Sequence, residues 1–539
     1  MFTRSLKNRL LQLQQVMPSH PLSLAIVAAI FNSFWFHGPL GRYLAQQLDF
    51  TSVFGWATAA AVWLLPTTLS VILFTSVALF SNLLLKICIV IVFLGNAIAL
   101  YFIDQYQVLL DKTMMGNVFS TDSVEVSTLM HPMLILYLVF WGGLPALLVW
   151  FSPLRSAPWG QKILGWLFAP SICLFLVYSL SFTWLWIDQH ASRVGAQLLP
   201  WSYLINTARH LDQERHNRLE FKPLMESVAL PLGERKRVVV LVIGESARAD
   251  RHSMLGYERD TNASTRPLGA VSFSGVQACA SYTVAALNCI LSHIGDEAPE
   301  RSTMGEPLPN YLNRQGVDVI WRTANNGHPP IKARLFETLS AINLYCPGGK
   351  CENDKWDESL LNGLKDLIEQ STQRRIFVVL HLQGSHGPAY HTKYPPEFER
   401  FKPTCTTVVL KDCNAQALQN AYDNTIAYTD HVLAKLTRIL QSVDATTGWL
   451  YVADHGESLG ESGLYLHGTP RVLAPSEQIN IPLMIWLSPA FRQEVHIDTS
   501  KAAGLIGIGQ GHVFHTVMGM LAMNGGPYRP KLDILKELE

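Results

Sequence analysis

The sequence has few charged residues for its length and no excess of either sign. Aspartate, glutamate, lysine and arginine make up 16% of its 539 residues, whereas soluble domains carry about 25%. The formal net charge is zero, so no basic surface is expected to attract a nucleic acid, and we expect no nucleic-acid partner. Internal repeats and low-complexity tracts are also absent. The shortage of charge is uneven along the chain, which points to two different environments.

Long apolar runs occupy the region 1–190. A membrane-spanning helix needs about 20 mostly apolar residues, and five stretches meet this condition: 21–40, 54–79, 82–103, 133–151 and 162–186. The first is the weakest, because His37 and Pro39 lie near its end. No cleavable signal peptide is expected, since the apolar run continues into further spans. We therefore predict an N-terminal bundle of five transmembrane helices over 1–190.

Basic residues predict how this bundle is oriented, because lysine and arginine are enriched in cytoplasmic loops. Arg4, Lys7 and Arg9 precede the first span, and Arg155 and Lys162 flank the loop between the fourth and the fifth. If both sites are cytoplasmic, an odd number of spans delivers the rest of the chain to the opposite side. We expect a multi-pass membrane protein with a linker over 191–236 and a globular domain over 237–539 on the side of the membrane opposite the N-terminus.

The cysteines agree with an exported domain. Six of them form close pairs in the sequence: Cys279/Cys289, Cys346/Cys351 and Cys405/Cys413. Such pairs suggest three local disulfides, which need an oxidising compartment such as a bacterial periplasm. A metal cluster or free thiols are the alternatives, although no Cys-x-x-Cys pair is present. Cys88 and Cys173 fall within predicted spans, where we expect them to pack as apolar residues.

The region 237–539 alternates strand-like and helix-like stretches, as an α/β domain does. The stretch 237–243 is short, uninterrupted and rich in valine, which predicts a strand buried on both faces of a parallel sheet. It runs into Gly244 and Glu245. Further elements are expected as strands over 317–321, 376–380, 449–453 and 482–487, and as amphipathic helices over 356–371 and 415–442.

Candidate metal ligands follow the predicted strands. Glu245 follows the first strand, Asp454 and His455 follow the strand at 449–453, and a Gly-Ser-His-Gly-Pro turn follows the strand at 376–380. Ligands of open α/β sheets bind beyond the carboxyl ends of the strands. Carboxylate and imidazole ligands from several strand ends favour zinc. An Asp-His pair in a polar loop is the alternative for the second of these motifs.

Three other positions are ambiguous by spacing alone. Thr283 begins a predicted helix, where it could bind a phosphate or act as an activated nucleophile, but a helix cap is the simpler interpretation. His386 and His467 could bind a phosphate or protonate a leaving group, although either could be a structural histidine. Asn117, Thr121 and Glu125 are spaced by four in the loop between the third and fourth spans, so they share one face of a helix. From spacing alone, a solvated helix face is the simpler interpretation.

The motifs together resemble the bacterial phosphoethanolamine transferases that modify lipid A, a family that includes the mobile colistin-resistance enzymes. The resemblance covers nearly the whole chain. It is carried by Gly-Glu-Ser-Ala-Arg-Ala-Asp at 244–250, by Gly-Tyr-Glu-Arg-Asp-Thr-Asn at 256–262, by Thr283 between Cys279 and Cys289, and by the motifs at 384–388, 422–425 and 454–461. It implies an alkaline-phosphatase/sulfatase-like fold for the C-terminal domain.

The resemblance also implies roles for the candidate residues. The catalytic zinc would be bound by Glu245, Thr283, Asp454 and His455, with Thr283 as the nucleophile. His386 and His467 would bind the phosphate group or a second zinc. The ethanolamine or phosphate of the donor would contact Asn117, Thr121 and Glu125, on a periplasmic loop helix. The three cysteine pairs fall where the family has disulfides.

Three segments depart from the family pattern. Ala286-Leu287-Asn288 replaces Ser-Val-Pro before Cys289, and Ala263 replaces a proline. The segment Thr323-Ala324-Asn325-Asn326-Gly327 lacks the family's Asp-Asn-Asn or Asp-Asn-Asp, and no lysine follows it until Lys332. These departures concern the acceptor pocket more than the metal site.

The resemblance implies zinc-dependent transfer of phosphoethanolamine from phosphatidylethanolamine to lipid A or other lipopolysaccharide, through a phospho-threonine intermediate. We expect a monomer surrounded by membrane lipids. Alternatives are a membrane-anchored phosphoglycerol transferase, a phosphoethanolamine transferase acting on a different glycan, and a non-catalytic zinc-binding sensor. A sulfatase is excluded, because no Cys/Ser-x-Pro-x-Arg segment follows Cys279.

Overall fold

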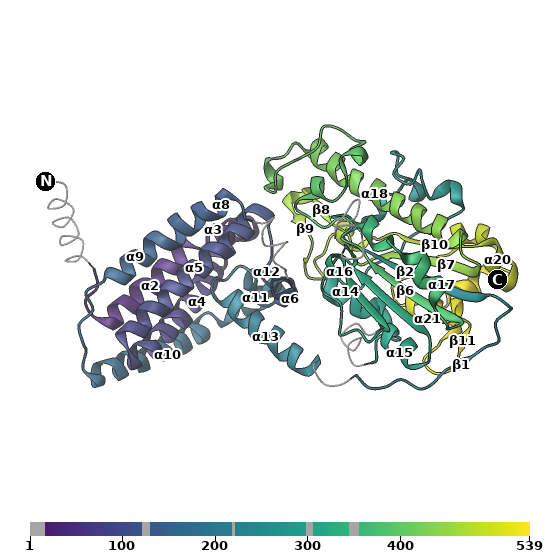
Figure 1. Ribbon diagram of the computed structural model, residues 1–539. Helices are drawn as coiled ribbons and strands as arrows, with labels where there is room; N and C mark the ends of the chain where they lie inside the picture. Colours follow the sequence, from purple (N-terminus) through teal and green to yellow (C-terminus); the bar gives the residue numbers. More distant parts are fainter. Residues whose placement is uncertain (1–16, 121–129, 218–220, 298–304, 344–354) are drawn as a thin grey trace. The chain divides into compact units, whose positions relative to one another are not determined.

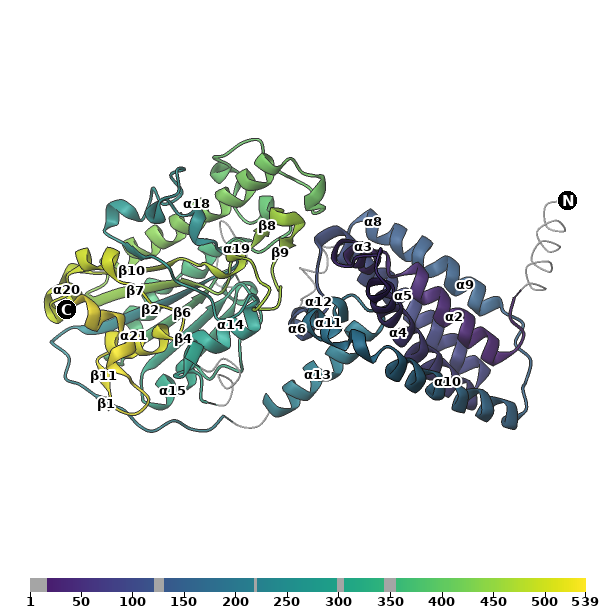
Figure 2. The ribbon, with the colours of Figure 1, turned by 180° about the vertical axis from the view of Figure 1, so that it is seen from behind.

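The computed structural model describes residues 17–120, 130–217, 221–297, 305–343 and 355–539. They fall into two compact units, one formed by 17–115 and 130–211 and the other by 116–120 and the residues from 212 onward. The first unit is helical, and the second is built around a mixed β-sheet (Figures 1 and 2). The chain thus separates an apolar helical part from an α/β part.

Among the described residues, four helical stretches of the first unit are long and apolar enough to cross a membrane. They are α4 (Val53–Phe80), α5 (Asn82–Tyr106), the stretch of α8 (Pro132–Tyr137), π-helical turn η1 (Leu138–Gly143) and α9 (Leu144–Phe151), and α10 (Trp159–Ser179). The first predicted span is instead a bent pair, α2 (Pro21–Trp35) and α3 (Gly38–Gln47), whose axes differ by 59°. Pro39 lacks the N–H needed to continue the helical ladder, which accounts for the break.

Many outward-facing side chains of the spans are apolar. On α10, Leu174 and Phe175 are 70% and 67% exposed, and such apolar surface suits a lipid environment. A helix also suits this environment, because its backbone groups bond to one another within the helix. The last predicted span ends at Ser179 rather than at 186. Short helices complete the unit and its continuation: α6 (Lys112–Ser120), α11 (Trp184–Gln189), α12 (Ala191–Gly195) and α13 (Trp201–Asn217).

The sheet of the second unit has the strand order β3–β10–β7–β2–β6–β4–β5. Its strands are β2 (Lys236–Gly244), β3 (Val271–Phe273), β4 (Asp318–Thr323), β5 (Leu335–Thr338), β6 (Arg375–His381), β7 (Ala445–Ala453) and β10 (Leu483–Leu487). The central β2 is parallel to both β6 and β7. β10 runs antiparallel to β7 and to β3, so the expected parallel sheet is mixed at one edge.

Helices cover both faces of this sheet (Figures 1 and 2). On one face α17 (Leu364–Gln370) and α18 (Ala415–Gln441) pack on a core that includes Val240, Leu433 and Trp449. On the other lie α15 (Leu308–Arg314) and α21 (His512–Met520). The remaining elements are α14 (Thr283–Ile290), α16 (Leu339–Asn343), α19 (Ser476–Ile479), α20 (Pro489–Val495), α22 (Ile534–Leu538), β1 (Val228–Ala229), β8 (Ser458–Leu459), β9 (Tyr465–Leu466) and β11 (Met523–Asn524).

The continuous helix expected over 356–371 is wrong. A 3-10 turn at Asp357–Leu361 is followed by α17, and Gly363 between them has φ 63°. A left-handed residue cannot continue a right-handed helix. The helix expected over 415–442 is confirmed as α18, which ends at Gln441.

Candidate active site

Parallel strands bring the predicted ligands to one edge of the sheet. Gly244, the last residue of β2, pairs with Ala453, the last residue of β7. Glu245 and Asp454 therefore follow neighbouring strands, and the backbone N–H of Ser246 donates to Asp454 Oδ1 at 3.0 Å. The side chains of both carboxylates are fully buried. Glu245 and Asp454 thus lie together at this edge, as their positions after the predicted strands indicate.

The loop after β6 is held against the same edge through a glycine. Gly384 has φ 50°, and a Cβ there would lie 2.7 Å from the backbone oxygen of Glu245. The next residue, Ser385, donates its N–H to that oxygen at 2.9 Å. A glycine is required at 384 for both reasons. The close approach places His386 at the site.

Thr283 directs its hydroxyl into the site and not along its helix. The N-cap position of α14 is Tyr282. Thr283 Oγ1 donates to Glu245 Oε2 at 3.2 Å and lies 3.4 Å from His455 Nε2. A disulfide between Cys279 and Cys289, with a Cα–Cα distance of 6.7 Å, closes the loop that contains Thr283. The geometry therefore does not support Thr283 as the cap of α14.

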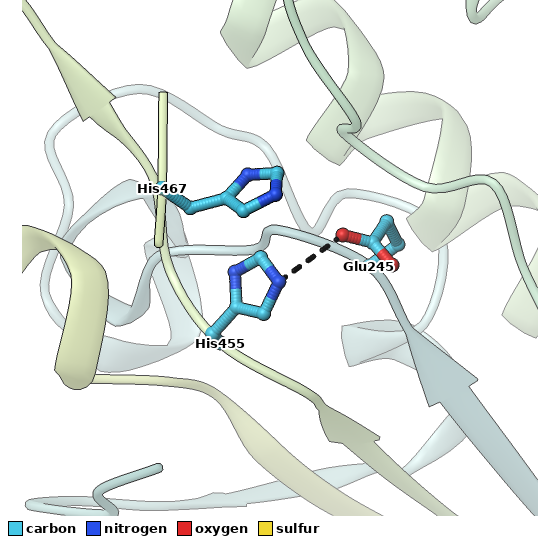
Figure 3. Close-up of side chains that lie close together, drawn as sticks. All are labelled: Glu245, His455 and His467. Carbon is cyan, nitrogen blue, oxygen red and sulfur yellow. Dashed lines mark ion pairs between the residues drawn. The ribbon is translucent and has the colours of Figure 1, made fainter. Parts of the chain in front are cut away.

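Glu245, His455 and His467 form a group whose ligand atoms all lie within 4.8 Å of one another (Figure 3). His455 Nε2 is 3.4 Å from Glu245 Oε1 and 3.2 Å from Asp454 Oδ2. The other ring nitrogen, Nδ1, lies 2.9 Å from the carbonyl oxygen of Gly456. Because a carbonyl only accepts, Nδ1 carries the proton and Nε2 keeps its lone pair for a ligand.

His467 is oriented by a buried carboxylate. Its Nδ1 lies 3.0 Å from Glu457 Oε2, and the other oxygen of Glu457 accepts a hydrogen bond from Tyr390 Oη at 3.0 Å. A carboxylate that fixes a histidine ring is a common support of metal and catalytic sites. The His467 ring centroid lies 4.3 Å from that of His455 and 5.3 Å from that of His386.

Burial shifts the ionisation of this cluster. Burial and the neighbouring Asp454 raise the pKa of Glu245 to about 7, and burial raises the pKa of Asp454 to about 7. Burial and the nearby His467 lower the pKa of His455 to about 4. Carboxylates buried side by side disfavour their own charge, and a bound cation reverses this cost.

The described residues fit a divalent metal ion. Asp454 Oδ2 is buried without a hydrogen bond among the described residues, although it faces His455. Carboxylate oxygens and an imidazole lone pair from separate segments converge there, which is the donor set of transition-metal sites. The buried floor is formed by Glu245, Asp454 and His455, whereas Thr283, His386 and His467 are partly exposed. A substrate would therefore meet the second set.

Sequence reasoning missed Asn325 as a neighbour of the ligands. Its Nδ2 donates to Glu245 Oε2 at 2.6 Å, the oxygen that also accepts from Thr283. In the same segment, a Cβ on Gly327 would lie 3.3 Å from Thr283 Cγ2. The segment follows β4, so the rule that ligands gather at strand ends could have found it. It lies against the nucleophile candidate.

Some of the site residues and cysteines predicted from the sequence are not described by the structure. Thr121, Glu125, Cys346 and Cys351 are not among the described residues, and the side chain of Asn117 is not described. The structure contains a disulfide between Cys405 and Cys413. It leaves Cys88 and Cys173 as free cysteines of intermediate burial.

Comparison with known proteins agrees with this architecture. Residues 237–523 match the family model "Sulfatase", and residues 67–215 match "Phosphoethanolamine transferase EptA/EptB". Phosphoethanolamine transferase EptA of Helicobacter pylori is 35% identical over 476 residues, which cover 86% of this chain and 88% of that protein. The chain belongs to the phosphoethanolamine transferase family. The protein is therefore an enzyme, and the family resemblance noted in its motifs is confirmed.

Other members of the phosphoethanolamine transferase family are also similar to this chain. Phosphatidylethanolamine transferase Mcr-1 of Escherichia coli is 32% identical, and the match covers 78% of this chain and 82% of that protein. The solved structure of the integral membrane protein lipooligosaccharide phosphoethanolamine transferase A from Neisseria meningitidis matches with a TM-score of 0.84 at 27% identity. That match covers 96% of this chain and 98% of that one. The predicted combination of a membrane bundle and a sulfatase-like α/β domain is confirmed.

Proposed function

We propose that this phosphoethanolamine transferase moves phosphoethanolamine from phosphatidylethanolamine to lipid A, or to another part of lipopolysaccharide, through a phospho-threonine intermediate. The observation that carries the proposal is the position of Thr283 Oγ1, which donates to Glu245 Oε2 at 3.2 Å. The names of two relatives support the substrates, because Mcr-1 is called a phosphatidylethanolamine transferase and the Neisseria protein a lipooligosaccharide phosphoethanolamine transferase.

The metal proposed for the site is zinc. It would be held by Glu245, Asp454, His455 and Thr283, with His467 or His386 in contact with the phosphate or with a second ion. When bound, zinc supplies a positive charge that lowers the pKa of a hydroxyl and offsets charge on phosphoryl oxygens. Two observations support this assignment: Asp454 Oδ2 is buried with no hydrogen bond among the described residues, and His455 Nε2, 3.2 Å from it, keeps its lone pair.

The first half-reaction forms a bond between Thr283 Oγ and the phosphorus of the donor. The hydroxyl proton passes toward Glu245 Oε2, the carboxylate oxygen to which it already donates. The bond from phosphorus to the diacylglycerol oxygen breaks, and that oxygen takes up a proton from the imidazolium form of His386 or His467 as diacylglycerol leaves. His386 and His467 are partly exposed, and in their protonated form they would donate hydrogen bonds to phosphoryl oxygens.

The second half-reaction returns the threonine. A phosphate or sugar hydroxyl oxygen of the acceptor attacks the same phosphorus, and the acceptor's hydroxyl proton passes to the histidine that protonated diacylglycerol. The bond to Thr283 Oγ breaks, and the threonine recovers its proton from Glu245. The acceptor gains an ammonium group, which masks negative charge. Cationic peptides such as polymyxins would then be attracted less to the cell surface. We place the chain in the inner membrane with the α/β unit in the periplasm, as the basic residues at the span ends indicate.

Replacing the nucleophile tests the proposal. We expect Thr283→Ala to reduce transfer of phosphoethanolamine from phosphatidylethanolamine by at least about 10³-fold, since no other hydroxyl would form the intermediate. Thr283→Ser is the matched control and should keep measurable transfer. In the wild-type protein given donor without acceptor, mass spectrometry of the peptide containing Thr283 should show one added phosphoethanolamine. Transfer at the wild-type rate by Thr283→Ala would exclude the intermediate, and an added phosphoglycerol would exclude the donor.

A further inference from the structure

Charged side chains are rare in the spans and the bent pair, which contain only Arg42, Lys86, Asp104 and Lys162. Lys86 Nζ donates to the carbonyl oxygens of Trp150 and Ser152, at 2.9 and 2.7 Å. Lys162 Nζ donates to the carbonyl oxygen of Ala78 at 2.9 Å. Both lysines therefore cap helix termini. Asp104 is the only acidic residue in the spans and the bent pair, and a helix end does not explain it.

Asp104 forms an exposed ion pair with Arg42. Arg42 Nη2 lies 2.6 Å from Asp104 Oδ1, and the two side chains are 63% and 21% exposed. Tyr137 Oη donates to Asp104 Oδ2 at 3.1 Å. These residues come from α3, from the last turn of α5 and from the end of α8, and α3 and α8 lie at the same end of the bundle (Figures 1 and 2). On the predicted topology this is the periplasmic end.

Aromatic side chains continue from this pair along the lipid-facing surface. The rings of Tyr137 and Trp141 are stacked, with centroids 5.0 Å apart, and Trp35 lies 6.3 Å from Trp141. Trp35 Nε1 donates to the backbone oxygen of Trp141 at 3.2 Å. Trp141 belongs to the π-helical turn η1, a rare form that is common at functional sites. Trp35 and Trp141 remain 44% and 37% exposed.

We propose that Arg42 and Asp104, with Tyr137 positioning the Asp104 carboxylate, bind the head group of a phospholipid that carries both a phosphate and a primary ammonium. The proposal rests on the proposed function, because phosphatidylethanolamine has this chemistry. The Arg42 guanidinium pairs with the phosphate, and the Asp104 carboxylate accepts from the ammonium. Trp35 and Trp141 contact the lipid below its head group, as tryptophans do at membrane interfaces.

The ion pair between Arg42 and Asp104 does not prevent this binding. An exposed pair contributes only about 0–1 kcal/mol, so each partner can exchange the other for the opposite charge of a zwitterion. An ionisable residue within a membrane span is commonly functional. The site distinguishes lipids by chemistry, since a trimethylated ammonium has no N–H to donate to Asp104 and a glycerol head group has no positive charge.

Retention of lipids by the full-length protein tests the site without relying on turnover. The protein, carrying Thr283→Ala so that no lipid is consumed, is incubated with equal amounts of phosphatidylethanolamine, phosphatidylcholine and phosphatidylglycerol with the same acyl chains. Native mass spectrometry then counts the lipids that remain bound. We expect several-fold enrichment of phosphatidylethanolamine over phosphatidylcholine, and loss of this enrichment in Asp104→Asn. Arg42→Gln should lower retention of all three lipids.

Control variants complete the test. Lys86→Gln, which removes a cation at the other end of the span, should keep the enrichment. If Asp104→Asn gives no folded protein by thermal unfolding, Tyr137→Phe decides, because it removes only one hydroxyl and should reduce the enrichment. The site would be disproved if the parent retained the three lipids equally. It would also be disproved if the enrichment were unchanged in folded Asp104→Asn or, where that variant does not fold, in Tyr137→Phe. Transfer of phosphoethanolamine by the Thr283→Ala parent would disprove the role of Thr283 as nucleophile and would not change the conclusion about this lipid site.

Discussion

At the scale of single residues, the position of the His467 ring depends on Glu457. The carboxylate accepts from Tyr390 Oη through one oxygen and lies 3.0 Å from His467 Nδ1 through the other. Burial raises the pKa of Glu457 to about 7. Glu457 holds the His467 imidazole best as a charged carboxylate, so this contact depends on neighbouring groups that stabilise the charge. The ring faces His455, and its orientation decides whether its free nitrogen meets a metal or a phosphate.

Glu457→Gln should weaken the site without removing a predicted ligand. Gln has the same size but no charge, and loss of such a support typically costs about 10–100-fold in metal affinity or activity. Competition with a chromophoric chelator would measure zinc affinity, and transfer to lipid acceptors would measure activity. Tyr390→Phe is the control, since it loses one hydrogen bond and keeps the carboxylate, and it should cost less. Equal zinc affinity and activity in Glu457→Gln and the wild type would contradict this role.

At the scale of elements, the site depends on how closely the loops after β2 and β6 approach. Gly384 adopts φ 50° with the backbone of Glu245 2.7 Å from where a Cβ would lie, whereas Gly363 adopts φ 63° with nothing within 4 Å. The two glycines share a left-handed backbone and differ in the space around them. Substitutions at the two positions therefore distinguish the effect of backbone strain from the effect of a clash at the site.

Gly384→Ala should be more damaging than Gly363→Ala. A left-handed backbone costs alanine about 1–2 kcal/mol at either position, but only at 384 must the loop carrying His386 move away from Glu245. We expect Gly384→Ala to lower transfer activity at least about tenfold, with Gly363→Ala near the wild-type rate. Denaturant unfolding should show similar or greater loss of stability for Gly384→Ala. The reverse order of activities would disprove the argument.

At the scale of the whole molecule, buried neutral histidines make stability depend on pH. Burial lowers the pKa of His252 to about 4, of His381 to about 3 and of His515 to about 4. Below the unfolded value near 6.5, the unfolded chain takes up protons that the folded chain does not. The stability from these groups is therefore present above about pH 6.5 and is lost as pH falls. Asp533, whose pKa burial raises to about 7, acts in the opposite direction.

Comparison with a variant isolates one of these contributions. His252→Gln removes a group whose folded pKa of about 4 lies well below 6.5. Between pH 7.5 and pH 4, the variant should lose less unfolding free energy than the wild type, by up to roughly 3 kcal/mol. Denaturant unfolding of the full chain in detergent at several pH values would measure the difference. Parallel curves for the two proteins would show that His252 is not held neutral in the fold.

Local chemistry explains what could be predicted from the sequence. Long apolar runs separate the membrane unit from the α/β unit, and the apolar strand-like runs before Glu245 and before Asp454-His455 predicted both the strands and the edge that these residues share. These patterns can be recognised locally, because an uninterrupted apolar run predicts a strand buried on both faces, and ligands bind beyond the carboxyl ends of such strands. The same reasoning missed the break at Gly363, since a glycine in a helical pattern gives no indication of its own φ.

The sequence by itself determined that this protein has an apolar bundle, an α/β unit and a set of metal-binding residue types after its strands. Only the tertiary structure decided that the Thr283 hydroxyl faces Glu245 and not its own helix, and that Asn325 donates to the same carboxylate. These contacts join residues 38 and 80 positions apart. Their geometry depends on how separate segments pack, which no local pattern of residues specifies.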